Sequence, residues 1–196
     1  LTIYMKKIFI IIVASFVLSK AGSNETYEKA YFAGGCFWCV EEYFDKVEGV
    51  VKTISGYSGG HTRNPTYEQV VKNQTGHVEV VEVTYDVTKV NYSELVKVHL
   101  NNIDPFDNGG QFCDRGESYK AVIFFKNNKE RTIIEKSLNN IEKRFKRKTY
   151  VQTKKFSMFY GGEEYHQDYY QRNFINYLIY KANCGREKKL ETIWEQ

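Results

Sequence analysis

The sequence is poor in cysteine, proline and methionine, and it lacks a strong excess of charge of either sign. Its 196 residues include four cysteines, two prolines and two methionines, and the formal net charge is only +4. The basic run 143–155 has no aromatic or motif context that would indicate nucleic-acid binding. The chain also lacks internal repeats and low-complexity tracts. Its length suits one domain with a proper core rather than two.

A long hydrophobic run is absent too. The most apolar stretch, 8–18, is too short to span a bilayer, which takes about 20 residues. It follows Met5-Lys6-Lys7 and precedes Ser19-Lys20-Ala21, and this order is typical of a cleavable signal peptide. We therefore expect a signal peptide over 1–21, with the natural start at Met5, and a periplasmic or secreted protein.

The remaining chain is expected to hold one domain in which strands and helices alternate irregularly. A polar segment (22–30) leads into a catalytic domain (31–185), and a short C-terminal tail (186–196) follows. Hydrophobic periodicity predicts strands over 30–33, 78–85, 121–125 and 150–156. It predicts helices over 37–47, 67–72, 91–103, 134–145 and 163–180, with glycine-rich loops over 55–65 and 104–118. This order favours an α+β or two-layer α/β domain.

Cys36 lies where the first predicted strand gives way to a helix. Gly34 and Gly35 precede it, so the chain can turn sharply there and leave the sulfur uncovered. The backbone N–H groups and the dipole at a helix N-terminus favour a thiolate and lower the pKa of a thiol. We therefore expect Cys36 to be an ionised, reactive cysteine rather than a small core residue.

The other cysteines leave three interpretations open. Cys39 forms a Cys-x-x-Cys motif with Cys36, whereas Cys113 and Cys184 stand alone. In an exported protein four cysteines suggest a disulfide framework, and a zinc site would need all four to converge. The Cys-x-x-Cys spacing favours thiol exchange over both. The four histidines have no ligand spacing, and no metal site is expected.

Glu79 is a candidate proton donor. Period-2 alternation places its side chain on the same strand face as Val81, Val83 and Tyr85, which looks partly buried. Burial raises the pKa of a carboxyl group and keeps its proton near neutrality. From periodicity alone, a strand-end glutamate that reaches solvent is the simpler alternative.

The segment 32–41, FAGGCFWCVE, resembles the active-site segment of the A-type peptide methionine sulfoxide reductases. Further matches follow in the family's order and extend the resemblance over roughly residues 31–185. They are 55–57 (SGY), 64–68 (NPTYE), 75–81 (TGHVEVV), 114–119 (DRGESY) and 164–169 (EYHQDY). The expected fold is accordingly an α+β, two-layer α/β sandwich with a ferredoxin-like mixed sheet, helices and long glycine-rich loops.

The resemblance implies a role for each matching residue in the reduction of methionine-S-sulfoxide, free and in proteins. Cys36 would attack the sulfoxide sulfur, and Glu79 would donate a proton to the oxygen. Tyr67 and Tyr119 would hydrogen-bond that oxygen, with Asp114 in support.

The same resemblance implies a substrate pocket and a way to restore the nucleophile. Phe37 and Trp38 would line the pocket for the substrate methyl group. Cys36 would become a sulfenic acid, and Cys184, on a mobile glycine-containing tail, would convert it to an intramolecular disulfide. Cys39 is the alternative resolving cysteine, and the role of Cys113 stays open.

The expected partners follow from this chemistry. The enzyme would bind no cofactor and would act as a monomer on oxidised proteins and free methionine sulfoxide. An external dithiol, a thioredoxin-like protein fed by a membrane electron carrier, would reduce it. Ser118 and Lys120 replace the Gln and Arg that are more common in the family, which affects details of substrate contact.

A second function remains open: a thioredoxin-like dithiol-disulfide exchange protein that uses Cys36 and Cys39. That class needs a cis-proline loop, which is hard to place with only Pro65 and Pro105.

Overall fold

The computed structural model describes residues 26–195, so the predicted signal peptide (1–21) lies outside the described residues. No helix in this described part is both long and apolar enough to cross a membrane. The strands are β1 (Tyr27–Ala33), β2 (Val50–Ser58), β3 (Val78–Asp86), β4 (Gly110–Gln111), β5 (Asp114–Arg115), β6 (Val122–Phe125), β7 (Gln152–Lys155) and β8 (Phe159–Gly161). The helices are α1 (Phe37–Asp45), α2 (Tyr67–Val71), α3 (Tyr92–Asn101), α4 (Asn128–Phe145), α5 (Tyr169–Arg172), α6 (Phe174–Cys184) and α7 (Arg186–Trp194), with 3₁₀ turns at Glu117–Tyr119 and Glu164–His166.

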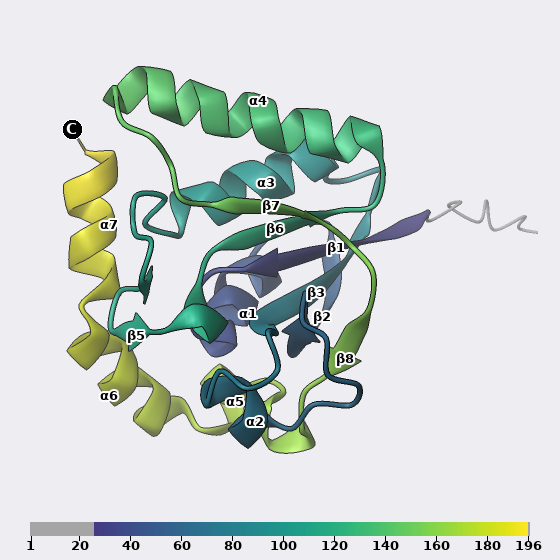
Figure 1. The fold of residues 1–196 in the computed structure, drawn as a ribbon, viewed down its shortest axis with the longest axis vertical. Coiled ribbons are helices and arrows are strands. Elements are labelled where there is room, and N and C mark those ends of the chain that lie inside the picture. Colours follow the sequence, from purple (N-terminus) through teal and green to yellow (C-terminus); the bar gives the residue numbers. More distant parts are fainter. Residues whose placement is uncertain (1–25, 196) are drawn as a thin grey trace, which may run out of the picture.

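A six-stranded mixed sheet forms the centre of the molecule (Figure 1). Its strand order is β7-β6-β1-β3-β2-β8. Neighbouring strands are antiparallel except for β6 and β7, which are parallel and are joined through helix α4. The inner order β6-β1-β3-β2, with its helical crossovers, is the ferredoxin-like arrangement. The predicted α+β fold with a mixed sheet is therefore confirmed.

The helices α1, α3 and α4 cover one face of the sheet and give the fold its second layer. Their apolar side chains join those of the central strands in one buried cluster, which includes Phe32, Phe44, Val83, Leu95 and Ile134. On the opposite face a smaller cluster is capped by Phe156, which follows β7, and by Phe159, the first residue of β8. The backbone of β1 and β3 is therefore fixed from both sides. This rigidity matters because both strands lead to the candidate active site.

Two predicted boundaries are wrong. Strand β1 begins at Tyr27, inside the segment that was expected to be a polar lead-in. Strand β2 includes residues 55–58, which were expected to form a loop. Its last stretch of polar residues is buried rather than exposed, since Ser55 and Ser58 have no exposed surface. The Ser58 hydroxyl donates to the Met158 carbonyl at 2.6 Å. Because serine rather than an apolar residue occupies these buried positions, the sequence lacks the apolar pattern that predicts a strand.

The helix predicted over 163–180 is also wrong, because the chain breaks there into a 3₁₀ turn and two helices. Asp168 adopts a left-handed conformation with φ of 53°. The preceding Gln167 uses its side-chain amide to bond both backbone groups of Ser55 on β2, at 3.0 Å each. A tertiary contact therefore interrupts a locally helical sequence.

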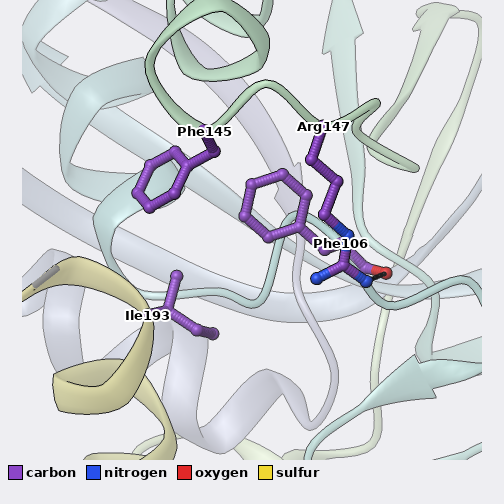
Figure 2. Close-up of a pocket in the computed structure, with 4 residues that line it drawn as sticks. All are labelled: Phe106, Phe145, Arg147 and Ile193. Carbon is purple, nitrogen blue, oxygen red and sulfur yellow. Dashed lines mark hydrogen bonds between the residues drawn. The ribbon is translucent and has the colours of Figure 1, made fainter.

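The segment expected to be a C-terminal tail forms helix α7 and is packed against the domain. The buried Arg186 guanidinium donates to the carbonyls of Asn102 at 2.7 Å and Gly34 at 3.3 Å. At the other end of α7, Ile193 lies beside Phe106 and Phe145 around a pocket of about 140 Å³ (Figure 2). Helix α7 is thus part of the domain, and its first residue contacts the glycine pair before Cys36.

Candidate active site

The start of helix α1 positions the reactive sulfur. Gly35 has φ of +84°, a left-handed conformation that glycine adopts without strain, and Cys36 is the N-cap of α1. The Cys36 backbone N–H donates to the Asp114 carboxyl group. The next N–H, that of Phe37, donates to Glu79 Oε2 at 2.9 Å. Two carboxyl groups from distant segments therefore lie beside the Cys36 side chain.

Glu79 is held within the fold rather than at its surface. It lies on β3 opposite Tyr57 of β2 and is only 2% exposed. Burial raises the pKa of its carboxyl group well above the usual range, despite the opposing hydrogen bond from the Phe37 N–H. Burial therefore favours the protonated, neutral form of the Glu79 carboxyl group. The alternative that its side chain reaches solvent is wrong.

Cys36 was expected to be an ionised thiolate, and this expectation is wrong for the substrate-free form. Burial raises the pKa of the Cys36 thiol, and the hydrogen bond to Cys39 and the nearby Glu79 and Asp114 raise it further. The helix N–H groups that were expected to stabilise a thiolate are already bonded to these two carboxyl groups. Cys36 is 5% exposed and carries its proton.

Tyr67 and Tyr119 converge on this pair of groups from two different segments. Tyr67 is the first residue of α2, and Tyr119 ends a 3₁₀ turn. The Tyr119 hydroxyl donates a hydrogen bond to the Tyr67 oxygen. Burial raises the pKa of Tyr67 to about 12 and also raises that of Tyr119, with Glu79 as the second cause in each case. Both hydroxyls are therefore donors at any physiological pH.

An aromatic wall continues from Cys36 along α1. Phe37 is fully buried and packs against His166, with ring centroids 4.9 Å apart. Trp38 is half-buried and stacks on Tyr169 at 3.8 Å. The Trp38 indole N–H donates to His166 Nδ1 at 3.2 Å. Burial lowers the pKa of His166, so this imidazole is neutral and fixes the indole in place.

Comparison with known proteins identifies the family. A family model described as "Peptide methionine sulfoxide reductase" matches residues 28–196. The chain belongs to this family. The reductase is 45% identical over 175 residues to the peptide methionine sulfoxide reductase MsrA of Listeria innocua, covering 88% of this chain and 99% of that protein. It is 47% identical over 168 residues to MsrA 2 of Caulobacter vibrioides, covering 85% of each.

Solved structures agree with this assignment. The methionine sulfoxide reductase A of Corynebacterium diphtheriae superposes with a TM-score of 0.68 at 30% identity, covering 78% of this chain and 77% of that one. The reduced form of Mxr1 from Saccharomyces cerevisiae superposes with a TM-score of 0.71 at 24% identity, covering 77% and 88%. The second likeness supports the fold alone. The family assignment favours the sulfoxide reductase over the thioredoxin-like exchange protein.

The four cysteines of the reductase are sorted into two pairs. Cys36 and Cys39 are buried free thiols, and the Cys36 thiol hydrogen-bonds the Cys39 sulfur. Cys113 and Cys184 form a disulfide. A fully stapled module is therefore excluded. Cys184 lies at the last residue of α6 and is followed by α7, so the expected mobile tail is wrong.

One group of possible metal ligands lies close to the site. Ligand atoms of Cys113, Asp114 and Cys184 are all within 4.8 Å of one another. The two sulfurs are joined to each other, so neither is a thiolate ligand in this form. This group is better described as a disulfide beside a carboxyl group.

Three polar residues of the reductase site were not predicted from sequence. The Tyr180 hydroxyl donates to Asp114 Oδ2 at 2.7 Å. Glu163 accepts from the Tyr57 hydroxyl at 2.6 Å and from the Tyr67 N–H at 2.8 Å, so it ties α2 to the sheet. His166 belongs to a matching motif but was given no role. Helical spacing could have linked Tyr180 to Cys184, four residues later, whereas no local pattern indicates Glu163.

Proposed function

We propose that this chain reduces methionine-S-sulfoxide, free and in proteins, to methionine, acting as a monomer that repairs oxidised proteins. Cys36 becomes a sulfenic acid, and an intramolecular disulfide follows. One observation carries the proposal: the buried carboxyl group of Glu79 accepts the N–H of Phe37, the residue next to Cys36, and burial raises its pKa, so a candidate proton donor lies beside the sulfur nucleophile.

The site holds the two protons that the proposed first step needs, one on the Glu79 carboxyl group and one on the Cys36 thiol. The Cys36 sulfur attacks the sulfoxide sulfur while Glu79 protonates the departing oxygen, which leaves poorly as an anion. This attack forms a sulfur–sulfur bond, and the S–O bond breaks so that the protonated oxygen leaves as hydroxide. Hydroxide then attacks the Cys36 sulfur, which breaks the sulfur–sulfur bond, releases methionine and leaves Cys36 as a sulfenic acid. Glu79 recovers a proton from the Cys36 thiol. The carboxyl group is therefore restored for the next turnover.

The remaining residues support this step by position. Tyr67 and Tyr119, as permanent donors, hydrogen-bond the sulfoxide oxygen as its negative charge grows. Asp114 holds the Cys36 backbone N–H and so fixes the turn before α1. Trp38 supplies an apolar wall for the substrate methyl group, and Phe37 supplies the buried floor.

The enzyme is expected to discriminate between the two sulfoxide epimers. Cys36 and Glu79 have fixed positions, so only one configuration at the sulfoxide sulfur places the sulfur next to the nucleophile and the oxygen next to the proton donor. The S epimer of N-acetyl methionine sulfoxide should therefore be consumed and the R epimer left. Chromatography of a racemic mixture incubated with the enzyme and dithiothreitol measures this. Equal consumption of both epimers would contradict the proposed geometry.

We also propose that the protein is exported and that its reductant is a thioredoxin-like protein fed by a membrane electron carrier. The signal-peptide pattern of residues 5–21 supports export. A disulfide formed outside the cytoplasm must receive its electrons there, which supports the second part. In fractionated cells the mature protein should lack residues 1–21 by mass and lie outside the cytoplasm. Full-length protein in the cytoplasm would contradict export.

A further inference from the structure

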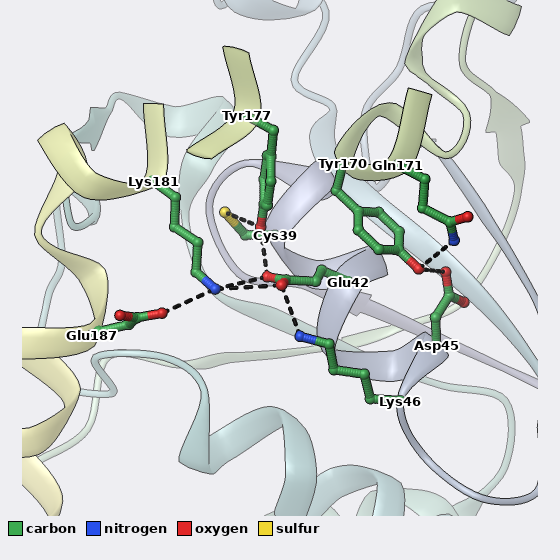
Figure 3. Close-up of polar contacts among 9 residues, drawn as sticks. All are labelled: Cys39, Glu42, Asp45, Lys46, Tyr170, Gln171, Tyr177, Lys181 and Glu187. Carbon is green, nitrogen blue, oxygen red and sulfur yellow. Dashed lines mark hydrogen bonds and ion pairs between the residues drawn. The ribbon is translucent and has the colours of Figure 1, made fainter. Parts of the chain in front are cut away.

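One face of helix α1 is joined to the chain segment that begins helix α5. Trp38, Glu41 and Asp45 lie three and four residues apart, so their side chains share that face. Trp38 stacks on Tyr169, with ring centroids 3.8 Å apart and an interplanar angle of 12°. At the other end of the face, Asp45 Oδ2 accepts the Tyr170 hydroxyl at 2.8 Å (Figure 3). The segment that carries the aromatic partner of Trp38 is therefore held at two points along α1.

Glu41 makes a third contact, between these two points. Its carboxyl group accepts the backbone N–H of Asp168, the residue before Tyr169. Asp168 has φ of 53°, a left-handed conformation that residues other than glycine adopt at a cost and keep only where neighbouring contacts fix it. The hydrogen bond to Glu41 is such a contact, because it fixes the amide group of Asp168. Glu41 thereby sets the direction in which the chain enters α5.

The carboxyl group of Glu41 occupies a fully buried position. The residue is 1% exposed, and its Oε2 atom is buried without a hydrogen-bond partner among the described residues. Burial raises the pKa of Glu41 to about 8, so the neutral form predominates at pH 7. An apolar side chain would fill the space without burying an unpartnered polar atom, which costs free energy. The bond to the Asp168 N–H is a contribution that only a polar side chain can make here.

The neighbouring acidic residue has different partners. Glu42 accepts the Tyr177 hydroxyl at 2.6 Å (Figure 3). It also pairs with Lys46 at 2.7 Å and with Lys181 at 3.0 Å. Apart from Lys46, these partners lie on α6 rather than on segment 168–170. The two adjacent glutamates of α1 therefore hold different parts of the chain, which makes one a control for the other.

We propose that Glu41, together with Asp45, is a positioning residue of this reductase that holds Tyr169 against Trp38 and so keeps the aromatic wall of the substrate pocket in place. This inference rests on the proposed function, in which Trp38 contacts the substrate methyl group. Without the bond to Glu41, Asp168 relaxes toward an ordinary backbone conformation and the Tyr169 ring moves with it. Trp38 then loses its stacking partner, and the substrate loses part of its apolar contact.

Steady-state kinetics of Glu41→Leu test this positioning. Leucine fills the space but cannot accept the Asp168 N–H, so KM for N-acetyl methionine sulfoxide should rise about tenfold, the worth of one aromatic stacking contact. The turnover number kcat should stay within about threefold, because the bonds that hold Cys36 and Glu79 do not involve segment 168–170. Glu41→Gln keeps an accepting oxygen and should keep KM within about twofold. An unchanged KM in Glu41→Leu, or equal rises in both variants, would overturn the inference.

The same substitution one residue later is the control. Glu42→Leu also removes a carboxyl group from α1 but leaves the contacts of segment 168–170 intact, so its KM should stay within about twofold. Equal rises of KM in the two leucine variants would indicate general damage to α1 and would overturn the specific role of Glu41.

Quenching of tryptophan fluorescence tests the position of Tyr169 without any turnover. The chain has two tryptophans, so Trp194→Phe leaves Trp38 as the only one. In that background Glu41→Leu should roughly double the acrylamide quenching constant, because the Trp38 ring loses the cover of Tyr169. Glu41→Gln should leave the constant unchanged. Equal quenching in the parent and in Glu41→Leu would overturn the inference.

Tyr170→Phe gives the same test should Glu41→Leu fail to fold, as judged by circular dichroism. It removes only the bond to Asp45, at the half-buried end of the contact. Quenching of Trp38 and KM should both rise in this variant, and no change in either would overturn the inference. A protein that shows the expected quenching but reduces no sulfoxide would overturn the proposed function and leave the positioning of Tyr169 intact.

Discussion

Replacing Cys36 with serine should lower kcat/KM for methionine sulfoxide by at least about 10⁴-fold, because the hydroxyl group is a far weaker nucleophile at this position. No other described thiol has a backbone N–H bonded to Asp114 and a neighbouring N–H bonded to Glu79. Cys39 therefore cannot take over the attack. Steady-state methionine release with dithiothreitol as reductant measures the loss.

The folding of this variant and the chemical intermediate can be checked together. Circular dichroism and thermal unfolding should match those of the unaltered protein, because the substitution keeps the size of a buried side chain. A reagent that traps sulfenic acids should label Cys36 after sulfoxide treatment and should label no cysteine of Cys36→Ser. Turnover by Cys36→Ser within tenfold of the unaltered enzyme would contradict the assigned nucleophile.

Replacing Glu79 with glutamine should lower kcat/KM by about 10²–10⁴-fold, the usual contribution of a general acid. The amide keeps the shape and the bond to the Phe37 N–H but has no acidic proton to give. Glu82→Gln is a matched control on the same strand: Glu82 is 5% exposed, and its carboxyl group pairs with Lys29 at 2.8 Å. Its activity should change by less than about twofold, and equal losses in both variants would contradict the role of Glu79.

The pH dependence should distinguish the two variants further. Because the acid form of Glu79 is the active one, and burial raises its pKa, activity should fall as the pH rises through that raised value. Glu79→Gln should lose this alkaline limb, and Glu82→Gln should keep it. Glu79 also takes up a proton on folding, so its contribution to stability is lost as the pH rises. Glu79→Gln should therefore be at least as stable as the unaltered protein above neutral pH.

Much of this fold could be predicted from local patterns, because the central elements alternate clearly. Strand β3 and helix α3 match their apolar periodicity, and Asn91 caps α3 as its sequence indicates. Strand β2 was not predicted, since it buries Ser55 and Ser58 where a pattern of apolar residues was sought. The breaks in 163–180 depend on Gln167 bonding to β2, 112 residues away. Contacts of this range leave no local signature.

The site shows the same division between local and distant causes. A glycine pair before a helix indicated Cys36. The phase of its strand alone favoured a solvent-exposed Glu79, and only the family resemblance gave that residue a role. The raised pKa of the Cys36 thiol could not be predicted from the sequence, because it depends on burial and on Asp114 and Glu79, which approach from other segments. The bond between Cys113 and Cys184 closes over 71 residues, and spacing along the chain does not indicate such a pair.

The position of strand β1 has a consequence for how the chain acquires its structure. Although β1 is the first strand, it lies inside the sheet, where Tyr31 pairs with Glu82 on one side and with Phe124 on the other. The sheet therefore cannot close until most of the polypeptide is available. Such non-local pairing slows folding, so an emerging chain stays extended until residues 122–125 of β6 are available to pair with β1.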